Sequence, residues 1–196
     1  MQHTFDKLLK DIKKCQTCAA FLPNAPKPIV SVSPESKILV IGQAPGTKVH
    51  ESDIPFNDKS GENLRDWLGV TKAQFYDTKL FGIVPMGFCF PGSNPKGGDL
   101  PPRKECAPQW HNALFSEMPK VELVLLIGQY AQKYYLGKSM KKNLTETVKY
   151  GYEYLPKYFP LVHPSPLNFR WQAKNPWFKT DVLPMLQKKV EQITHN

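Results

Sequence analysis

Two short turns carry the polar side chains best suited to contact a small ligand. Gln43 lies in the turn Gly42–Gly46, directly after the apolar run Ile38–Ile41, and His163 begins a second turn that follows another apolar run. An unbroken apolar run of this length is typical of a strand buried on both faces of a parallel sheet. Because open α/β sheets bind ligands at the carboxyl edge of their strands, we expect both turns to border one cavity. The alternatives are a plain βα turn and a histidine with a purely structural hydrogen bond.

Four cysteines form a second group of residues that could carry chemistry. Cys15 and Cys18 make a CxxC pair, and Cys89 and Cys106 lie near the two ends of an expected loop over residues 86–108. We expect no export signal, and in such a chain cysteines are metal ligands more often than disulfides. Tetrahedral zinc and a four-cysteine iron–sulfur cluster both use four thiolates, so the spacing leaves both open. Four unrelated free cysteines are the third interpretation.

The elements that must position these residues alternate along the chain between strands and helices. Short apolar runs predict four buried strands, at residues 38–41, 79–84, 121–127 and 158–162. Helical periodicity and helix-start residues predict helices at 4–14, 60–69, 107–118, 130–136 and 176–194, the last kinked or interrupted at Pro184. Loops are expected at 47–59 and 86–108. The alternation predicts an α/β fold, a three-layer α/β/α sandwich with a central four-stranded parallel sheet.

Length and composition fit one globular domain spanning residues 1–196. The chain contains 19 prolines, but aromatic and aliphatic residues lie between them, so we expect structured turns and no disordered tract. No apolar run approaches the ~18 residues of a membrane span, so we expect a cytoplasmic protein without a membrane partner. The formal net charge of +9 favours a polyanionic partner, chiefly nucleic acid. No obligate protein partner is evident.

Together, the two turns, the pair Pro55-Phe56 and the cysteines resemble the uracil-DNA glycosylase superfamily, and most closely its iron–sulfur (family four) branch. In that branch the turn Gly-Glu-Ala-Pro-Gly is followed by Pro-Phe and a glycine, which Gly42–Gly46, Pro55-Phe56 and Gly61 match in spacing. Its cluster ligands are a CxxC pair, a cysteine after the second strand and one in the next helical region. The resemblance implies that a 4Fe-4S cluster, with zinc as the alternative occupant, is bound by Cys15, Cys18, Cys89 and Cys106.

The resemblance also implies an activity on DNA that contains a damaged base. Members of the superfamily flip such a base out of the duplex and hydrolyse its N-glycosidic bond. By analogy, Phe56 stacks on the flipped base and His163 hydrogen-bonds a base carbonyl, while Gln43 holds the base or orients water. His50 or Asp53 is a further candidate for positioning that water. The other implied contacts are to the base, from Gly42, Ala44 and Asn57, and to DNA, from Ser60, Pro164, Ser165, Leu167 and Asn168, with Leu167 filling the gap in the stack.

Two positions depart from the pattern of that branch. Gln43 stands where the branch carries a glutamate, and an amide cannot act as a base. Pro85 lies four residues before Cys89, where the superfamily usually places an asparagine that reads the uracil edge. Because a buried polar reader gives large discrimination between substrates, the excised base is left open. Candidate replacements are Asn57, Asn94 and main-chain groups of Met86–Phe90.

The sequence leaves three functions in view. The first is a DNA glycosylase of base-excision repair that acts on uracil or another deaminated or modified base. The second is a DNA-binding glycosylase homologue without excision activity. The third is an α/β hydrolase acting on a free nucleotide or a similar small molecule, which would turn over nucleotides without binding DNA.

Overall fold

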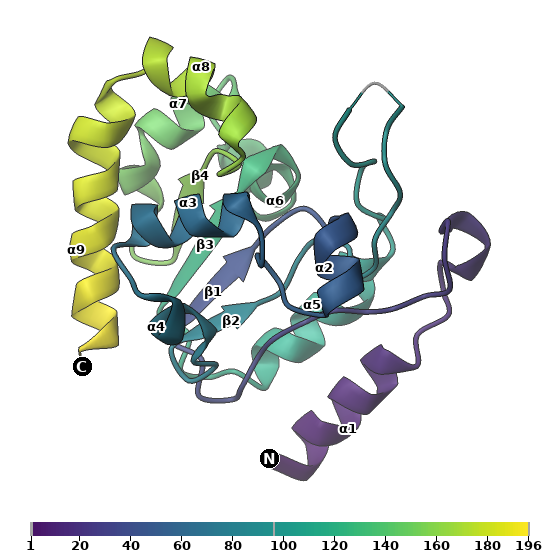
Figure 1. Ribbon diagram of the computed structural model, residues 1–196. Coiled ribbons are helices and arrows are strands. Elements are labelled where there is room, and N and C mark those ends of the chain that lie inside the picture. Colours follow the sequence, from purple (N-terminus) through teal and green to yellow (C-terminus); the bar gives the residue numbers. More distant parts are fainter. Residues whose placement is uncertain (1, 96, 196) are drawn as a thin grey trace.

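A parallel sheet forms the centre of the molecule (Figure 1). The computed structural model describes residues 2–95 and 97–195. Within them, four strands are ordered β2-β1-β3-β4, with the bounds β1 Ile38–Ile41, β2 Phe81–Ile83, β3 Leu123–Ile127 and β4 Tyr158–Leu161. All three pairings are parallel, and Ile38 lies in register between Phe81 and Leu123. The predicted four-stranded parallel sheet is therefore confirmed.

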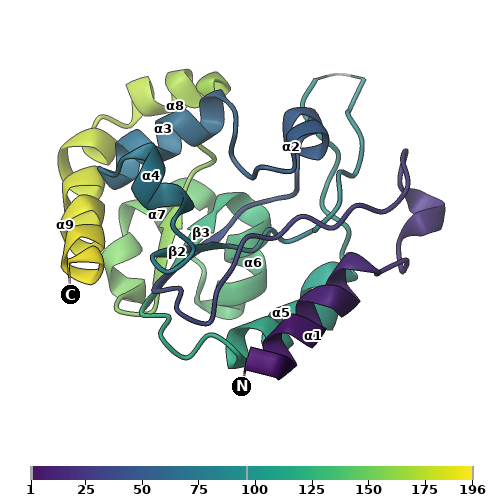
Figure 2. The same ribbon diagram turned by 60° about the horizontal axis from the view of Figure 1, so that its bottom comes forward.

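Helices cover both faces of this sheet (Figure 2). Successive strand residues point to opposite faces, so Ile38 and Val40 of β1 enter one core while Leu39 and Ile41 enter the other. The first core is closed by α3 (Lys59–Leu68), α4 (Lys72–Tyr76) and α9 (Leu183–Thr194), and the second by α1 (Gln2–Lys13), α5 (Cys106–Ser116) and α6 (Gly128–Leu136). Each fully buried aliphatic side chain stabilises the fold by about 1.5–3 kcal/mol, which explains why the strands are unbroken apolar runs. The predicted α/β/α sandwich is confirmed.

Shorter elements connect the layers. They are α2 (Thr47–Ser52), α7 (Leu144–Lys149), α8 (Phe169–Lys174), the 3-10 helices Ala19–Phe21, Gly137–Ser139, Gly151–Tyr154 and Pro166–Asn168, and a π-helix, Phe178–Val182. The prediction of a loop throughout 47–59 is wrong, because α2 occupies its first half. A helix of six residues has fewer than two turns, too few for apolar periodicity to be read. No helix in the described residues is long and apolar enough to cross a membrane.

Pro184 lies at the start of α9 and does not interrupt it. Proline is tolerated in the first turn of a helix because the N–H that it lacks would have no partner there. The residues before α9, 178–182, form the π-helix, which runs directly into α9, so the predicted helix over 176–194 changes from π-helical to α-helical just before Pro184.

Three chain segments leave the sheet at the same edge and border the candidate site. β1 continues into the turn that carries Gln43, β4 into His163 and β2 into Pro85. The chain after β2 stays alongside the turn after β1, because the Gly87 N–H donates to the Gln43 carbonyl at 3.0 Å. In the described residues the segment between β2 and α5 forms no helix or regular strand, only an isolated bridge between Ser93 and Asp99.

Candidate functional site

The turns after β1 and β4 border one cavity of about 380 Å³. Gln43, Phe56 and His163 all line it, so the structure brings together three of the side chains to which the sequence analysis gave a role. The cavity lies in the lower part of the range for ligand pockets, about 300–1,000 Å³, and has room for a nucleobase. The other described residues in its wall are Ile29, Gly42, Ala44, Pro45, Gly46, Val49, Pro55, Asp58, Ser60, Ile83, Pro85, Gly98, Asp99 and Ser165.

The turn after β1 is tied to the long loop between β2 and α5. The Gln43 side chain donates from Nε2 to the Leu100 carbonyl at 3.1 Å. Gly42 has no side chain to occupy the neighbouring space, where an added Cβ would lie 3.3 Å from Cζ of Phe56. Glycine at this position therefore lets the Phe56 ring lie directly against the turn.

Phe56 is fixed at the cavity wall in an unusual backbone conformation. Its φ is +55°, a region that bulky residues rarely adopt and that costs about 1–3 kcal/mol. Arg65 Nη1 donates to the Phe56 carbonyl at 3.4 Å, and the Tyr76 hydroxyl donates to the Pro55 carbonyl at 3.0 Å. At Gly61 an added Cβ would lie 1.7 Å from the Phe56 carbonyl oxygen, so only glycine fits beneath it. The surrounding residues thus hold the ring in place before any ligand binds.

His163 extends from the turn after β4 as a neutral imidazole. Burial lowers the pKa of His163 below its ordinary value, and the charge of Asp58 opposes this shift without cancelling it. The turn itself is fixed by two amides: Asn168 Nδ2 donates to the His163 carbonyl at 2.6 Å, and Asn63 Nδ2 donates to the Pro164 carbonyl at 2.8 Å. A neutral imidazole has one donor and one acceptor, so it can meet the edge of a base without placing a charge in the cavity.

Beyond His163 the turn presents apolar side chains to solvent. Leu167 is 81% exposed and Phe169 is 62% exposed. Ser165 Oγ accepts the Leu167 N–H at 3.2 Å, which fixes the start of the short 3-10 helix at this point. Ser165 also lines the cavity, as does Ser60. Leu167, whose side chain is exposed, therefore lies two residues along the chain from Ser165 in the cavity wall.

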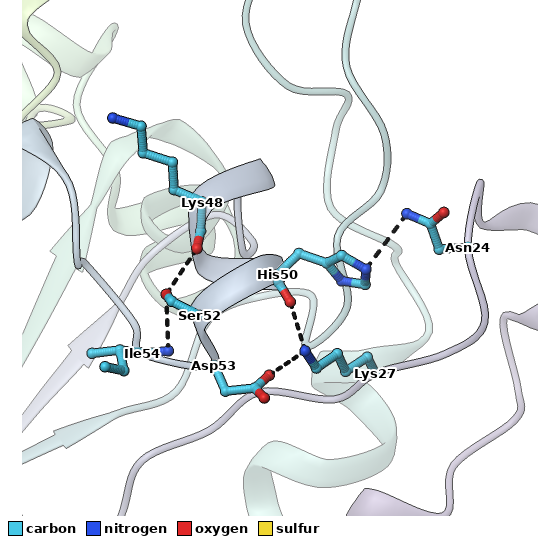
Figure 3. A network of polar contacts seen from close by, with 7 residues as sticks. All are labelled: Asn24, Lys27, Lys48, His50, Ser52, Asp53 and Ile54. Atoms are coloured by element: carbon cyan, nitrogen blue, oxygen red, sulfur yellow. Dashed lines mark hydrogen bonds and ion pairs between the residues drawn. The ribbon is translucent and has the colours of Figure 1, made fainter.

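His50, Asp53 and Asn57 do not line the cavity. His50 lies on α2 and Asp53 ends that helix, and both contact one lysine: Lys27 Nζ donates to the His50 carbonyl at 2.7 Å and pairs with Asp53 Oδ1 at 2.6 Å (Figure 3). The His50 ring faces Asn24, with 3.5 Å between its Nε2 and the amide nitrogen. Asn57 is exposed. The structure does not bring these three predicted residues to the cavity.

Pro85 lines the cavity at the end of β2, where the asparagine was expected. Its carbonyl is already hydrogen-bonded to His111 Nε2, at 3.1 Å. Because a carbonyl only accepts, Nε2 carries the proton, and His111 Nδ1 then accepts from the Tyr135 hydroxyl. Burial lowers the pKa of His111 to about 4, so this ring is also neutral. Asn94, one of the predicted replacements for the asparagine, does not line the cavity.

Two carboxylates in the cavity wall are absent from the predicted site residues. Asp58 caps α3, its Oδ1 accepting the Gly61 N–H at 2.9 Å. Asp99 comes from the long loop, and partial burial raises the pKa of Asp99, with a further rise from the charge of Asp58. Aspartate is a preferred N-cap, so a helix start at Asp58 could be read from the sequence. Nothing in the residues around Asp99 distinguishes it from an ordinary loop carboxylate.

Residues 30–187 match the family described as the Uracil DNA glycosylase superfamily. The chain belongs to this superfamily. The matching stretch contains β1 to β4 and, except Ile29, every residue named above in the cavity wall. A relative, the Type-4 uracil-DNA glycosylase of Sulfurisphaera tokodaii, is 23% identical over 174 residues, which cover 83% of this chain and 74% of that protein.

In this superfamily member the four cysteines line a second pocket, which shares none of its described lining residues with the cavity. All four are free thiols, and burial raises the pKa of Cys89 to about 11 and that of Cys106 to about 12. In the described part of the chain no three Cys, His, Asp or Glu side chains converge closely enough to hold one metal ion. Four cysteine thiols around one pocket are the donor set that both a four-iron cluster and a tetrahedral zinc use.

Trp110 supplies an independent observation at the cysteine pocket. Its indole Nε1 is buried and has no hydrogen-bond partner among the described residues, and its side chain lines the pocket. A buried N–H without an acceptor costs about 1–3 kcal/mol. A sulfur-rich group in this pocket would offer that acceptor.

Proposed function

We propose that this protein is a DNA glycosylase that takes uracil, or another deaminated or modified base, out of the DNA stack and hydrolyses its N-glycosidic bond. The observation that carries the proposal is the single cavity shared by Gln43, Phe56 and His163 in a chain of the superfamily. The activity in the name of the Sulfurisphaera tokodaii relative supports the same assignment.

The flipped base lies against Phe56 and meets His163. Base–aromatic stacking contributes about 1–3 kcal/mol per base, and the Phe56 ring is already fixed, so little side-chain entropy is lost on binding. His163 donates a hydrogen bond to a carbonyl of the base. Because negative charge develops on the base as it leaves, a donor placed there beforehand stabilises the transition state more than the ground state.

DNA is held by the turn after β4 and by the positive charge of the protein. Leu167 enters the gap left by the base, where burial of a leucine side chain is worth about 1.5–3 kcal/mol. Ser60 and Ser165 are placed at the cavity wall, where a hydroxyl reaches a phosphate next to the flipped nucleotide. The net charge of +9 adds the sequence-independent attraction to the backbone.

A 4Fe-4S cluster is held by Cys15, Cys18, Cys89 and Cys106 in this proposal, with zinc as the alternative. The four cysteines around one pocket support it, as does the buried Trp110 indole N–H, which has no partner among the described residues. When bound, the cluster supplies a cross-link between the N-terminal segment and the loop after β2. The hydrolysis itself uses only residues of the cavity.

The test is excision from duplex oligonucleotides that contain uracil, hypoxanthine or xanthine. We expect abasic product from at least one of them with purified metal-loaded protein. Because Pro85 leaves no side-chain reader for uracil, the assay spans all three bases. Absence of product from every substrate would contradict the proposal.

A DNA-binding homologue without excision activity is the second candidate. Gln43 favours it, because an amide cannot take the proton of water as the glutamate of the related branch can. This candidate predicts DNA affinity that falls steeply with salt, with no abasic product at any pH. Product formation in the same assay separates the two.

A further inference from the structure

The cavity needs a base for the attacking water, and the expected residues do not supply one. Gln43 carries an amide, and its Nε2 donates to the Leu100 carbonyl. His50 and Asp53 lie outside the cavity wall and contact Lys27 (Figure 3). His163 is the neutral donor to the base in the proposed function. A proton acceptor must therefore come from another lining residue.

Asp99 reaches the cavity because Gln43 anchors the loop that carries it. The bond from Gln43 Nε2 to the Leu100 carbonyl, 3.1 Å long, fixes the residue next to Asp99 against the turn after β1. On the same turn Gly46 makes room for the carboxylate: an added Cβ there would lie 3.0 Å from Asp99 Oδ2. A glutamate at position 43 could not donate this hydrogen bond. Gln43 has no carboxylate of its own, but its amide thus positions the carboxylate of Asp99 in the cavity.

Asp99 is better suited to accept a proton than Asp58, the other carboxylate among the described residues of the wall. Asp58 Oδ1 already accepts the Gly61 N–H at 2.9 Å as the cap of α3, so this oxygen has a structural partner. Among the described residues the carboxylate of Asp99 has no hydrogen bond or ion pair. Partial burial and the charge of Asp58 raise the pKa of Asp99, which makes its carboxylate a stronger base than an ordinary aspartate.

We propose that Asp99, positioned by Gln43, orients and deprotonates the water that attacks the flipped nucleotide, an inference that rests on the proposed glycosylase function. The water oxygen bonds to C1′ of the sugar while the C1′–N bond breaks. The electron pair of that bond leaves with the base, which His163 hydrogen-bonds. The proton of the water passes to the Asp99 carboxylate and then to solvent, and the base takes a proton from solvent after it leaves.

Matched substitutions of carboxylate to amide test this role. Single-turnover excision is measured on the duplex that the wild-type protein cleaves best, with affinity for the abasic product as a second readout. D99N should lower the rate by about 10²–10⁴-fold, the usual contribution of a general base, with product affinity nearly unchanged. D53N is the control, because asparagine tolerates its left-handed backbone (φ +60°) and its ion pair with Lys27 is exposed. It should keep the wild-type rate.

The dependence of the rate on pH separates a base from a structural residue. Asp58 and His163 are the other titratable groups in the described wall. The wild-type rate should rise with pH as Asp99 ionises, and D99N should lack this rise. D58N, in which asparagine still caps α3, removes the neighbouring charge and should move the rise to lower pH.

The outcomes distinguish the two proposals. An active wild-type protein with an equally active D99N overturns the role of Asp99 and leaves the glycosylase function standing. Loss of the pH-dependent rise in D58N but not in D99N gives the role to Asp58 and also overturns the inference. A wild-type protein inactive on all three substrates overturns the glycosylase function and, with it, the role of Asp99.

Discussion

His163 contributes to the reaction through a single hydrogen bond from a neutral ring. Removing one such preorganised donor typically costs about 2.7–4 kcal/mol of transition-state stabilisation. H163A should therefore slow single-turnover excision by about 10²–10³-fold while affinity for abasic DNA changes little. H195A, which removes an exposed histidine at the end of α9, is the matched control and should keep the wild-type excision rate. Equal rates for H163A and the wild type would remove His163 from the chemistry.

His111 predicts how stability depends on pH. Its pKa is about 4 in the folded protein against an ordinary 6.5, so between these values the unfolded chain binds a proton that the folded chain does not. The contribution of His111 to the free energy of unfolding is fully present above pH 6.5, and it should fall by about 3 kcal/mol as the pH drops to 4. In H111Q an amide can still donate to the Pro85 carbonyl but cannot titrate.

Urea unfolding of wild type and H111Q at several pH values between 7 and 4 measures this difference. His163, whose pKa is also lowered by burial, and the carboxylates contribute equally to both proteins and cancel in the comparison. The free energies of unfolding of the two proteins should converge as the pH falls. A constant gap between them would show that His111 does not titrate in this range.

For single residues, the sequence predicts the position of those that directly follow buried strands, but not of those placed by long-range contacts. Gln43 and His163 come directly after apolar runs whose ends must meet at one edge of the sheet, so their joint position in one cavity could be expected. His50 lies on α2 and Asp53 directly follows it, and no local pattern specifies the direction of this helix. Asp99 reaches the cavity through a hydrogen bond that joins residues 57 positions apart, which one sequence does not encode visibly.

The turn after β4 combines a backbone fixed by hydrogen bonds with an exposed leucine side chain. Asn63 and Asn168 hold its carbonyls, while Leu167 extends into solvent. L167A should leave the free energy of unfolding unchanged, because an exposed side chain loses little packing. It should slow excision from duplex DNA by about 10-fold or more, since up to 1.5–3 kcal/mol of leucine burial is lost.

Excision from single strands should change less in L167A, because no stack has to be opened there. M185A removes an exposed side chain from α9 and is the control for a general effect of surface apolar loss. An equal loss on single and double strands would argue against insertion of Leu167 into the duplex.

Element prediction succeeded where an apolar run was long or strictly periodic. All four strands lie within the predicted runs, although β2 covers only residues 81–83 of the predicted 79–84. Leu80 belongs to the preceding turn, where its N–H donates to the Asp77 carbonyl at 2.9 Å. The short helices α2, α4, α7 and α8 have five or six residues each, too few to show a helical period.

The cysteine pocket joins distant parts of the molecule. Cys15 and Cys18 follow α1, Cys89 lies in the loop after β2, and Cys106 begins α5, which packs beside α1 (Figure 2). We expect purified protein to be brown and to contain about four iron and four sulfide per chain. C106S should be colourless and should unfold at a lower temperature than the wild type.

The control for C106S is wild-type protein from which the cluster has been removed by a chelator. If the lost cross-link causes the lower stability, this protein and C106S should unfold at similar temperatures. Colourless wild-type protein with one zinc per chain would show that zinc, and not an iron–sulfur cluster, occupies the cysteine pocket.

The alternation of strands and helices predicts the layers of the molecule but not the path of residues 86–105. That segment has no regular element in the described residues, and its position depends on contacts such as the one between Gln43 and Leu100. Cys89 and Cys106 near the two ends of the expected loop indicate a metal-binding role, but nothing in the sequence shows that the loop also brings a carboxylate to the cavity. The single domain over residues 1–196 stays a prediction.

A structure of the protein bound to duplex DNA, with a 2′-fluoro analogue of the excised nucleotide that resists hydrolysis, tests the central claim most directly. We predict that the analogue's base lies in the cavity, stacked on Phe56 and hydrogen-bonded to His163, with Leu167 in the gap that it left. A base that stays stacked within the duplex, while DNA covers another face of the protein, would contradict the account.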